Sequence, residues 1–120
     1  MANEITTTQI LHVKNGKLNA TKSQSSQKFT QDNVGGGLPG FVKVGTSEET
    51  LTTSDIGTLG WAWFKNLDDS NYIEMGFSTG VYGIRLEAGE VAMFRLNPGA
   101  TIYVRANTAE CKMEASIFED

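Results

Sequence analysis

The chain has 120 residues, a formal net charge of −4 and a hydrophobic fraction of 39%. This length suits one domain that buries a core without disulfides or metals, and the mildly acidic charge argues against a nucleic-acid partner. The N-terminus lacks the basic start and apolar core of a signal peptide, and no apolar run approaches the ~18 residues needed to span a bilayer. We therefore expect a chain made in the cytoplasm, with no membrane partner.

The first predicted element is a β-hairpin over residues 4–20. Asn15-Gly16 lies between two alternating runs, and this dipeptide favours the positive φ angles of a type I′ turn. The predicted register joins two apolar pairs across the hairpin, Val13 with Leu18 and Leu11 with Ala20. One face of the hairpin is therefore expected to be apolar.

A polar stretch and a glycine-rich stretch follow the hairpin. Residues 21–33 alternate weakly, as in an exposed edge strand or an arm, and residues 35–40 (GGGLPG) predict a flexible break. We expect residues 1–34 to form an N-terminal hairpin or arm that packs on the domain or reaches beyond it. Residues 35–120 are expected to form the body of a single domain.

Strand signals are strongest after Leu59. The segments LGWAWFKN and NYIEMGF are followed by four further apolar runs, separated by Ser-Thr-Gly, Ala-Gly, Pro-Gly and Asn-Thr. Helix signals are poor, because Gly supplies 13 of 120 residues and β-branched or aromatic residues fill the apolar runs. The pattern predicts an all-β, antiparallel β-sandwich of the jelly-roll or Greek-key kind.

The last four runs predict three successive hairpins. In this register Arg85 lies opposite Ala92, and Ala92 lies opposite Arg105. One predicted face is almost wholly apolar and carries Tyr82, Ile84, Leu86, Val91, Met93, Ile102, Val104, Cys111 and Met113. Arg95 falls on that side near a strand end, so the ten-residue spacing of the three arginines does not predict one cluster.

The opposite face of these hairpins carries a mixed aromatic and basic patch. Phe94 and Tyr103 lie beside Arg85 and Arg105, and Glu110 is the expected cross-strand partner of Arg105. Aromatic residues grouped with arginines are typical of protein–protein contacts. Arg85, Phe94, Tyr103 and Arg105 are therefore the candidate contact residues, unless a second sheet covers them.

No combination of residues predicts an enzyme. His12 has no cysteine or acid at ligand spacing, and Cys111 lies among apolar residues, as expected of a buried structural thiol. Asp68 and Asp69 supply oxygens that calcium prefers, but their loop lacks the spacing and closing Glu of a twelve-residue calcium loop. Asx-turn chemistry explains this loop. We expect no catalytic residue, no cofactor and no metal.

A carbohydrate-binding module is the alternative from another class. Trp61, Trp63 and Tyr72 offer aromatic rings for sugar stacking, and Asp68 and Asp69 offer polar contacts. Packing in the core is the favoured interpretation of the tryptophan pair.

Three segments carry a family resemblance: MANEITTTQILHVKNGKL, FKNLDDSNYIEMG and IRLEAGEVAMFRLNPGATIYVRANTAECKMEASI. They resemble small virion structural proteins of tailed bacteriophages, over most of the chain and most clearly in its C-terminal half. The resemblance implies a non-enzymatic part of the particle: a capsid decoration or cement protein, or a component of the tail or head–tail junction. It implies contacts with the major capsid protein or other virion proteins, and a homo-oligomer, of which a trimer is one form.

Overall fold

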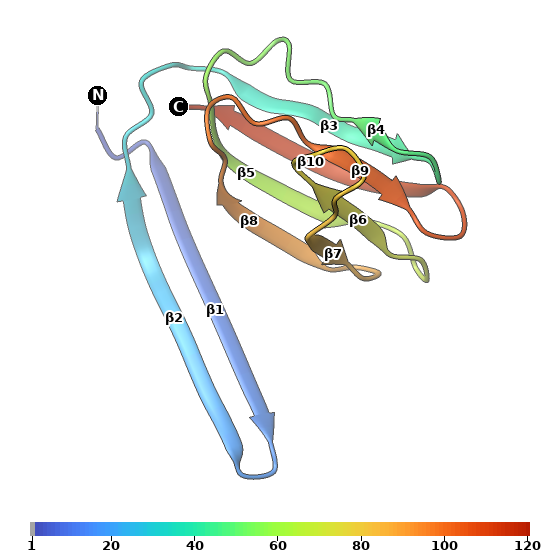
Figure 1. Ribbon diagram of the computed structural model, residues 1–120. Helices are drawn as coiled ribbons and strands as arrows, with labels where there is room; N and C mark the ends of the chain where they lie inside the picture. The colour runs from blue at the N-terminus through green and yellow to red at the C-terminus, as the bar shows by residue number, and fades with distance from the viewer. Residues whose placement is uncertain (1) are drawn as a thin grey trace. The chain divides into compact units, whose positions relative to one another are not determined.

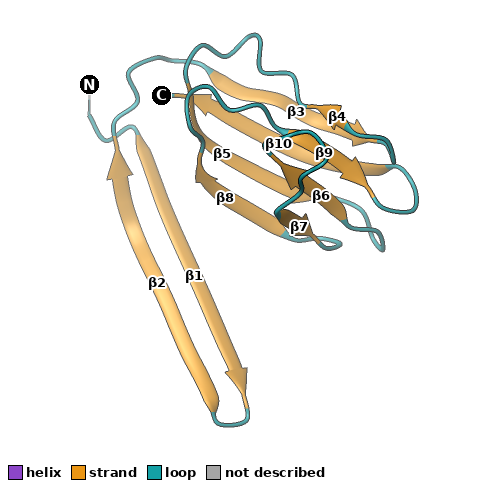
Figure 2. Ribbon diagram, viewed as in Figure 1, coloured by secondary structure: helices purple, strands orange, loops and turns teal. Residues whose placement is uncertain are grey.

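A computed structural model describes residues 2–120, which form ten β-strands and no helix. The chain divides into two compact units, Met1–Asn33 and Val34–Asp120. Figure 1 labels the strands in chain order, and Figure 2 shows that strands and loops make up both units. The prediction of an all-β chain is therefore confirmed.

The first unit is a long antiparallel hairpin of β1 (Ile5–Asn15) and β2 (Leu18–Phe29). Val13 pairs with Ala20, whereas the predicted register pairs it with Leu18, so the predicted register is wrong. The reason lies at the turn. Gly16 has a φ of 58° and takes the first central position, where a type II′ turn places glycine.

The second unit, called the body, is a sandwich of two four-stranded sheets. The β5 sheet has the order β3-β10-β5-β8, with bounds Gly36–Val44, Cys111–Glu119, Leu59–Asn66 and Val91–Arg95. The β6 sheet has the order β4-β9-β6-β7, with bounds Glu49–Thr50, Tyr103–Ala106, Ile73–Gly76 and Ile84–Leu86. All neighbouring strands are antiparallel. This strand order is the jelly-roll arrangement of an eight-stranded sandwich.

The final four strands alternate between the two sheets. β7 and β9 belong to the β6 sheet, whereas β8 and β10 belong to the β5 sheet. The three predicted hairpins are therefore wrong, because each loop between these strands crosses from one sheet to the other. A strand–turn–strand spacing fits both a hairpin and a sheet-crossing loop, and pairing of chain neighbours is only the commoner outcome.

The glycine-rich segment is part of a strand, so the predicted flexible break is wrong. β3 begins at Gly36 and pairs with β10 up to Val44. A Cβ on Gly36 would lie 2.5 Å from the Cα of Phe118, and Gly36 has a φ of 128°. Glycine here permits a close approach of two backbones at a β-bulge.

The core lies between the two sheets. Its fully buried side chains include Phe64, Ile73, Met75, Ile102, Met113 and Ile117. Cys111 is also buried, as predicted. On β8 the predicted faces are reversed: Val91 is exposed, whereas Ala92 and Phe94 pack against the core.

Candidate functional site

The four candidate contact residues do not lie on one face. Arg85 of β7 and Arg105 of β9 each pair in register with Glu74 of β6, on the outer face of the β6 sheet. Tyr103 faces the same side, because Ile102 before it and Val104 after it are both buried. Phe94 points the other way, into the space between the sheets. The patch predicted around Ala92 is therefore replaced by a row centred on Glu74.

Both arginines on this face are held by neighbours within the body. The Nε of Arg105 lies 3.0 Å from Oε1 of Glu74, and its guanidinium lies 4.3 Å from the ring centre of Tyr82. The guanidinium of Arg85 lies 3.9 Å from the ring centre of Tyr72. The expected pairing of Arg105 with Glu110 is wrong, since Glu74 takes that place. Stacking fixes the planes of both guanidinium groups over aromatic rings.

A carboxylate extends this row toward the loops. Glu48 accepts hydrogen bonds from the Tyr82 hydroxyl and from the Gly80 N–H, the latter at 2.7 Å. These two bonds lower the pKa of Glu48, and the same contact with Glu48 raises the pKa of Tyr82. Glu48 thus ties the segment before β4 to the β6–β7 connection through its ionised form.

Trp61 and Trp63 lie on the outer face of the β5 sheet, so the prediction that they pack in the core is wrong. The residues that alternate with them, Ala62 and Phe64, are buried in the core. Trp63 is 36% exposed and donates a hydrogen bond from Nε1 to Oε1 of Glu114 at 3.0 Å. Both alternating sets of side chains in this strand include large apolar residues. Alternation alone therefore could not decide which set faces inward.

These tryptophans belong to a larger apolar surface that the sequence did not reveal. The aromatic face is defined as the outward side chains of Phe41, Trp61, Trp63, Val91 and Met93. Trp63 lies between Ser116 and Met93 in register. Phe41 is 76% exposed and Val91 is 48% exposed. Exposed apolar surfaces on folded proteins are candidate interaction sites.

Lysines border the aromatic face at one end. Lys43 and Lys112 are paired across β3 and β10, and Lys65 lies next to Val91 across β5 and β8. Within residues 2–120 none of these three lysines takes part in an ion pair. At the opposite end, Arg95 is paired with Asp120 at 2.9 Å. Glu114 pairs in register with Phe41 and with Lys65, so three lysines outnumber one carboxylate along this rim.

The residues of the sugar-binding alternative are not gathered into one site. Trp61 and Trp63 face outward from the β5 sheet, whereas Tyr72 stacks with an arginine of the β6 sheet. Oδ2 of Asp68 accepts N–H bonds from residues 70 and 71 at 3.0 and 2.7 Å, which lowers its pKa and confirms the Asx-type turn. In the part of the chain that the structure describes, no three His, Cys, Asp or Glu side chains form a group that could hold a metal ion.

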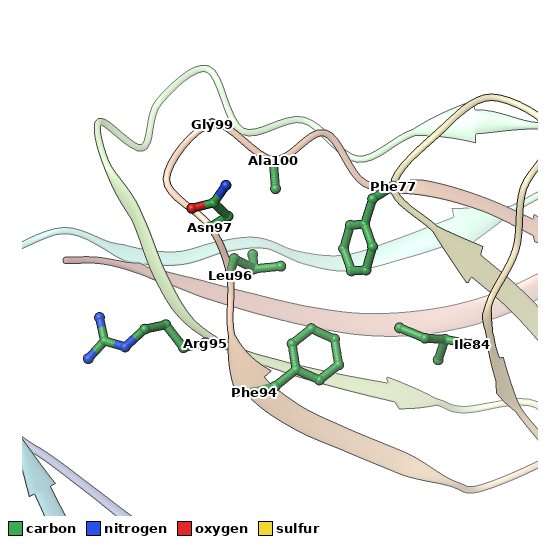
Figure 3. A pocket seen from close by; sticks show the side chains of 8 residues that line it. All are labelled: Phe77, Ile84, Phe94, Arg95, Leu96, Asn97, Gly99 and Ala100. Carbon is green, nitrogen blue, oxygen red and sulfur yellow. The ribbon is translucent and has the colours of Figure 1, made fainter.

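A cleft opens at the side of the body where β7 and β8 are the edges of their sheets. It has a volume of about 490 Å³ and its apolar lining includes Phe77, Ile84, Phe94 and Leu96. Figure 3 shows the rings of Phe77 and Phe94 and the side chain of Ile84 around one shared space. The two rings meet edge to face at 6.4 Å between centres. Phe94, predicted as a surface contact, therefore lines this cleft.

Comparison with protein-family models, curated proteins and solved structures finds no match to the chain. Residues 2–120 include no helix of the length and hydropathy needed to cross a membrane.

Proposed function

We propose that the chain is a non-enzymatic structural protein of a bacteriophage particle, a decoration or cement protein that stabilises the head through protein–protein contacts. The observation that supports this most is the aromatic face, where Phe41 is 76% exposed and Trp63 is 36% exposed. Covering such a surface removes apolar area from water and so favours association. Its lysine rim suits an acidic partner surface, such as one on the major capsid protein.

The fold and the expected copy number agree with this proposal. Jelly rolls serve in viral capsid domains as well as in lectins. Many copies on a symmetric lattice would convert weak single contacts into firm attachment, because each bound copy or arm raises the effective concentration of the next. No reaction at the surface is required for that role.

The proposal is tested by binding of the purified protein to particles assembled without it. Phe41→Glu combined with Trp63→Ala should lower the affinity by about thirtyfold or more, which is the effect of losing one strong interface residue. Arg85→Ala with Arg105→Ala is the matched variant on the other sheet and should bind as the wild type does. A loss of binding confined to the arginine variant would move the interface to the β6 sheet. Failure of the wild type to bind the particles would overturn the proposal.

Carbohydrate binding remains the second candidate because Trp63 is exposed on a sheet face. A glycan array probed with the wild type and with Trp61→Ala and Trp63→Ala separates the two functions. Strong sugar binding that depends on either tryptophan would favour a carbohydrate-binding module on the virion or tail. Sugar binding that is absent, or unchanged by both substitutions, would remove this alternative.

A further inference from the structure

The outer half of the β1–β2 hairpin has one apolar face that nothing in its own unit covers. Cross-strand pairing places Leu11, Val13, Leu18 and Ala20 on the same face, which also carries Lys22 opposite Leu11. Leu11 is 63% exposed and Leu18 is 57% exposed. A two-stranded ribbon has no second layer and is only marginally stable by itself in water. These four residues, called the hairpin apolar face, therefore require a partner surface.

The charges of the hairpin indicate which surface that is. Residues 9–24 contain Lys14, Lys17 and Lys22 and no acidic residue, whereas the body carries 12 of the 14 acidic side chains and only six of the ten basic ones. Two hairpins would therefore repel each other, and a hairpin and a body would attract each other. This favours the body of a second copy over its hairpin.

The cleft between β7 and β8 supplies a fitting apolar surface. Within the described chain β8 pairs only with β5, so it is an edge strand of the β5 sheet. The loop that joins β7 to β8 carries the exposed carboxylate of Glu90 and that of Glu87, which lies 3.5 Å from Arg85. An edge strand, an apolar cleft and acidic groups thus occur together on this side of the body.

We propose that the hairpin of one copy adds to the β8 edge of a second copy and lays its apolar face over the cleft. The hairpin would extend the β5 sheet, and alternation would then direct Leu11, Val13, Leu18 and Ala20 inward, toward Ile84 and Phe77. β8 has five residues and β1 has eleven, so β8 is long enough to pair with the part of β1 that carries Leu11 and Val13.

This contact joins two different surfaces, so repetition gives a closed ring or an open chain of copies. The inference concerns association between copies and does not depend on which virion protein the aromatic face binds.

Mixing two defective full-length variants tests the contact. Leu11→Ser with Leu18→Ser removes the hairpin apolar face, and Phe77→Arg places a charged side chain in the cleft at a position that is already 45% exposed. Sedimentation should show an oligomer for the wild type and a monomer for each variant. An equimolar mixture of the variants should form a one-to-one dimer, because one supplies an intact hairpin and the other an intact cleft. Circular dichroism checks that each variant is folded.

The matched control is Ile10→Ser. Ile10 is 68% exposed and lies on the opposite face of the hairpin, so this variant should assemble as the wild type does. A monomeric wild type at millimolar concentration would overturn the inference. So would continued self-association of either variant alone, which would indicate contacts between two hairpins or two bodies, and so would a mixture that stays monomeric. Particle binding can fail or succeed independently of all these outcomes.

Discussion

Asn66 shows how much of the body depends on single polar side chains that no sequence motif marks. It is fully buried at the end of β5. Its amide donates to the carbonyl oxygens of Asn71 and Leu86 at 2.8 and 2.9 Å, and its Oδ1 accepts from the Asp68 N–H at 2.9 Å. One side chain therefore holds the β5–β6 loop and links it to the end of β7. An asparagine within a polar turn carries no signal that separates this buried role from an exposed one.

Glu48 predicts how stability depends on pH. Its folded-state pKa lies below the usual value of 4.5 because Tyr82 and Gly80 donate hydrogen bonds to the carboxylate. A lowered carboxyl pKa stabilises the fold above the unfolded value, and this contribution is lost as pH falls through the folded value. The pKa of Tyr82 is raised above 10.0, so the corresponding stabilisation is lost as pH rises beyond that value.

Glu48→Gln should therefore lower the free energy of unfolding at neutral pH and flatten its decline at both the acid and the alkaline end. Urea denaturation measured across the pH range checks this. Tyr82→Phe removes the same hydrogen bond, so it should also reduce the decline of the free energy of unfolding at acid and at alkaline pH. The double variant should be little less stable than either single variant. Additive losses would show that the two side chains act separately.

At the scale of elements, Gly76 allows the backbone of β6 to lie close to the segment that leads to β7. A Cβ at this position would lie 1.9 Å from the carbonyl oxygen of Val81, so the backbone must move to admit one. We expect Gly76→Ala to lower the free energy of unfolding by about 1–3 kcal/mol, the usual cost of forcing extra atoms into a packed site. Gly83→Ala is the control, because no atom lies within 4 Å of its Cβ position and it should be nearly neutral. Equal losses for both, measured by urea denaturation, would contradict this explanation.

The same elements show what the sequence can and cannot predict. Alternation correctly indicates strands around Ile84, Val104 and Met113, and it correctly buries Cys111. It says which residues of a strand share a face but not which sheet the strand joins. The predicted register puts Phe94 on the outer face because it pairs this strand with its chain neighbours, whereas in the structure β8 pairs with β5. The partner of a strand in a jelly roll is set by packing between distant segments, which local patterns do not record.

The contact surfaces were hard to predict for the same reason. The aromatic face combines residues of β3, β5 and β8, which become neighbours only through the order of the β5 sheet. The arginine row likewise needs Glu74 of β6 between Arg85 and Arg105. The cleft needs β7 and β8 to be the edges of two different sheets. Each surface is a product of topology, and the sequence could supply only its separate members.

At the scale of the whole molecule, the two units differ in what stabilises them. The body buries a continuous apolar cluster between two sheets, and that cluster contains only residues from Val44 to Ile117. The hairpin has the hydrogen bonds of one ladder, and its large apolar residues Ile10, Leu11 and Leu18 are exposed. Stability by burial therefore belongs to the body, and the hairpin has the composition of a segment that gains its burial from a partner.

This difference predicts the result of dividing the chain. A fragment of residues 34–120 should fold alone and unfold cooperatively within about 3 °C of the melting temperature of monomeric full-length variants, because no core residue is removed. A peptide of residues 1–33 should be largely unstructured in dilute solution and gain strand signal by circular dichroism only when the fragment is added. Calorimetry of the fragment measures the first outcome and titration of the peptide the second. A fragment that fails to fold would mean that the hairpin stabilises its own body, and a peptide that folds alone would mean that the ribbon needs no second surface.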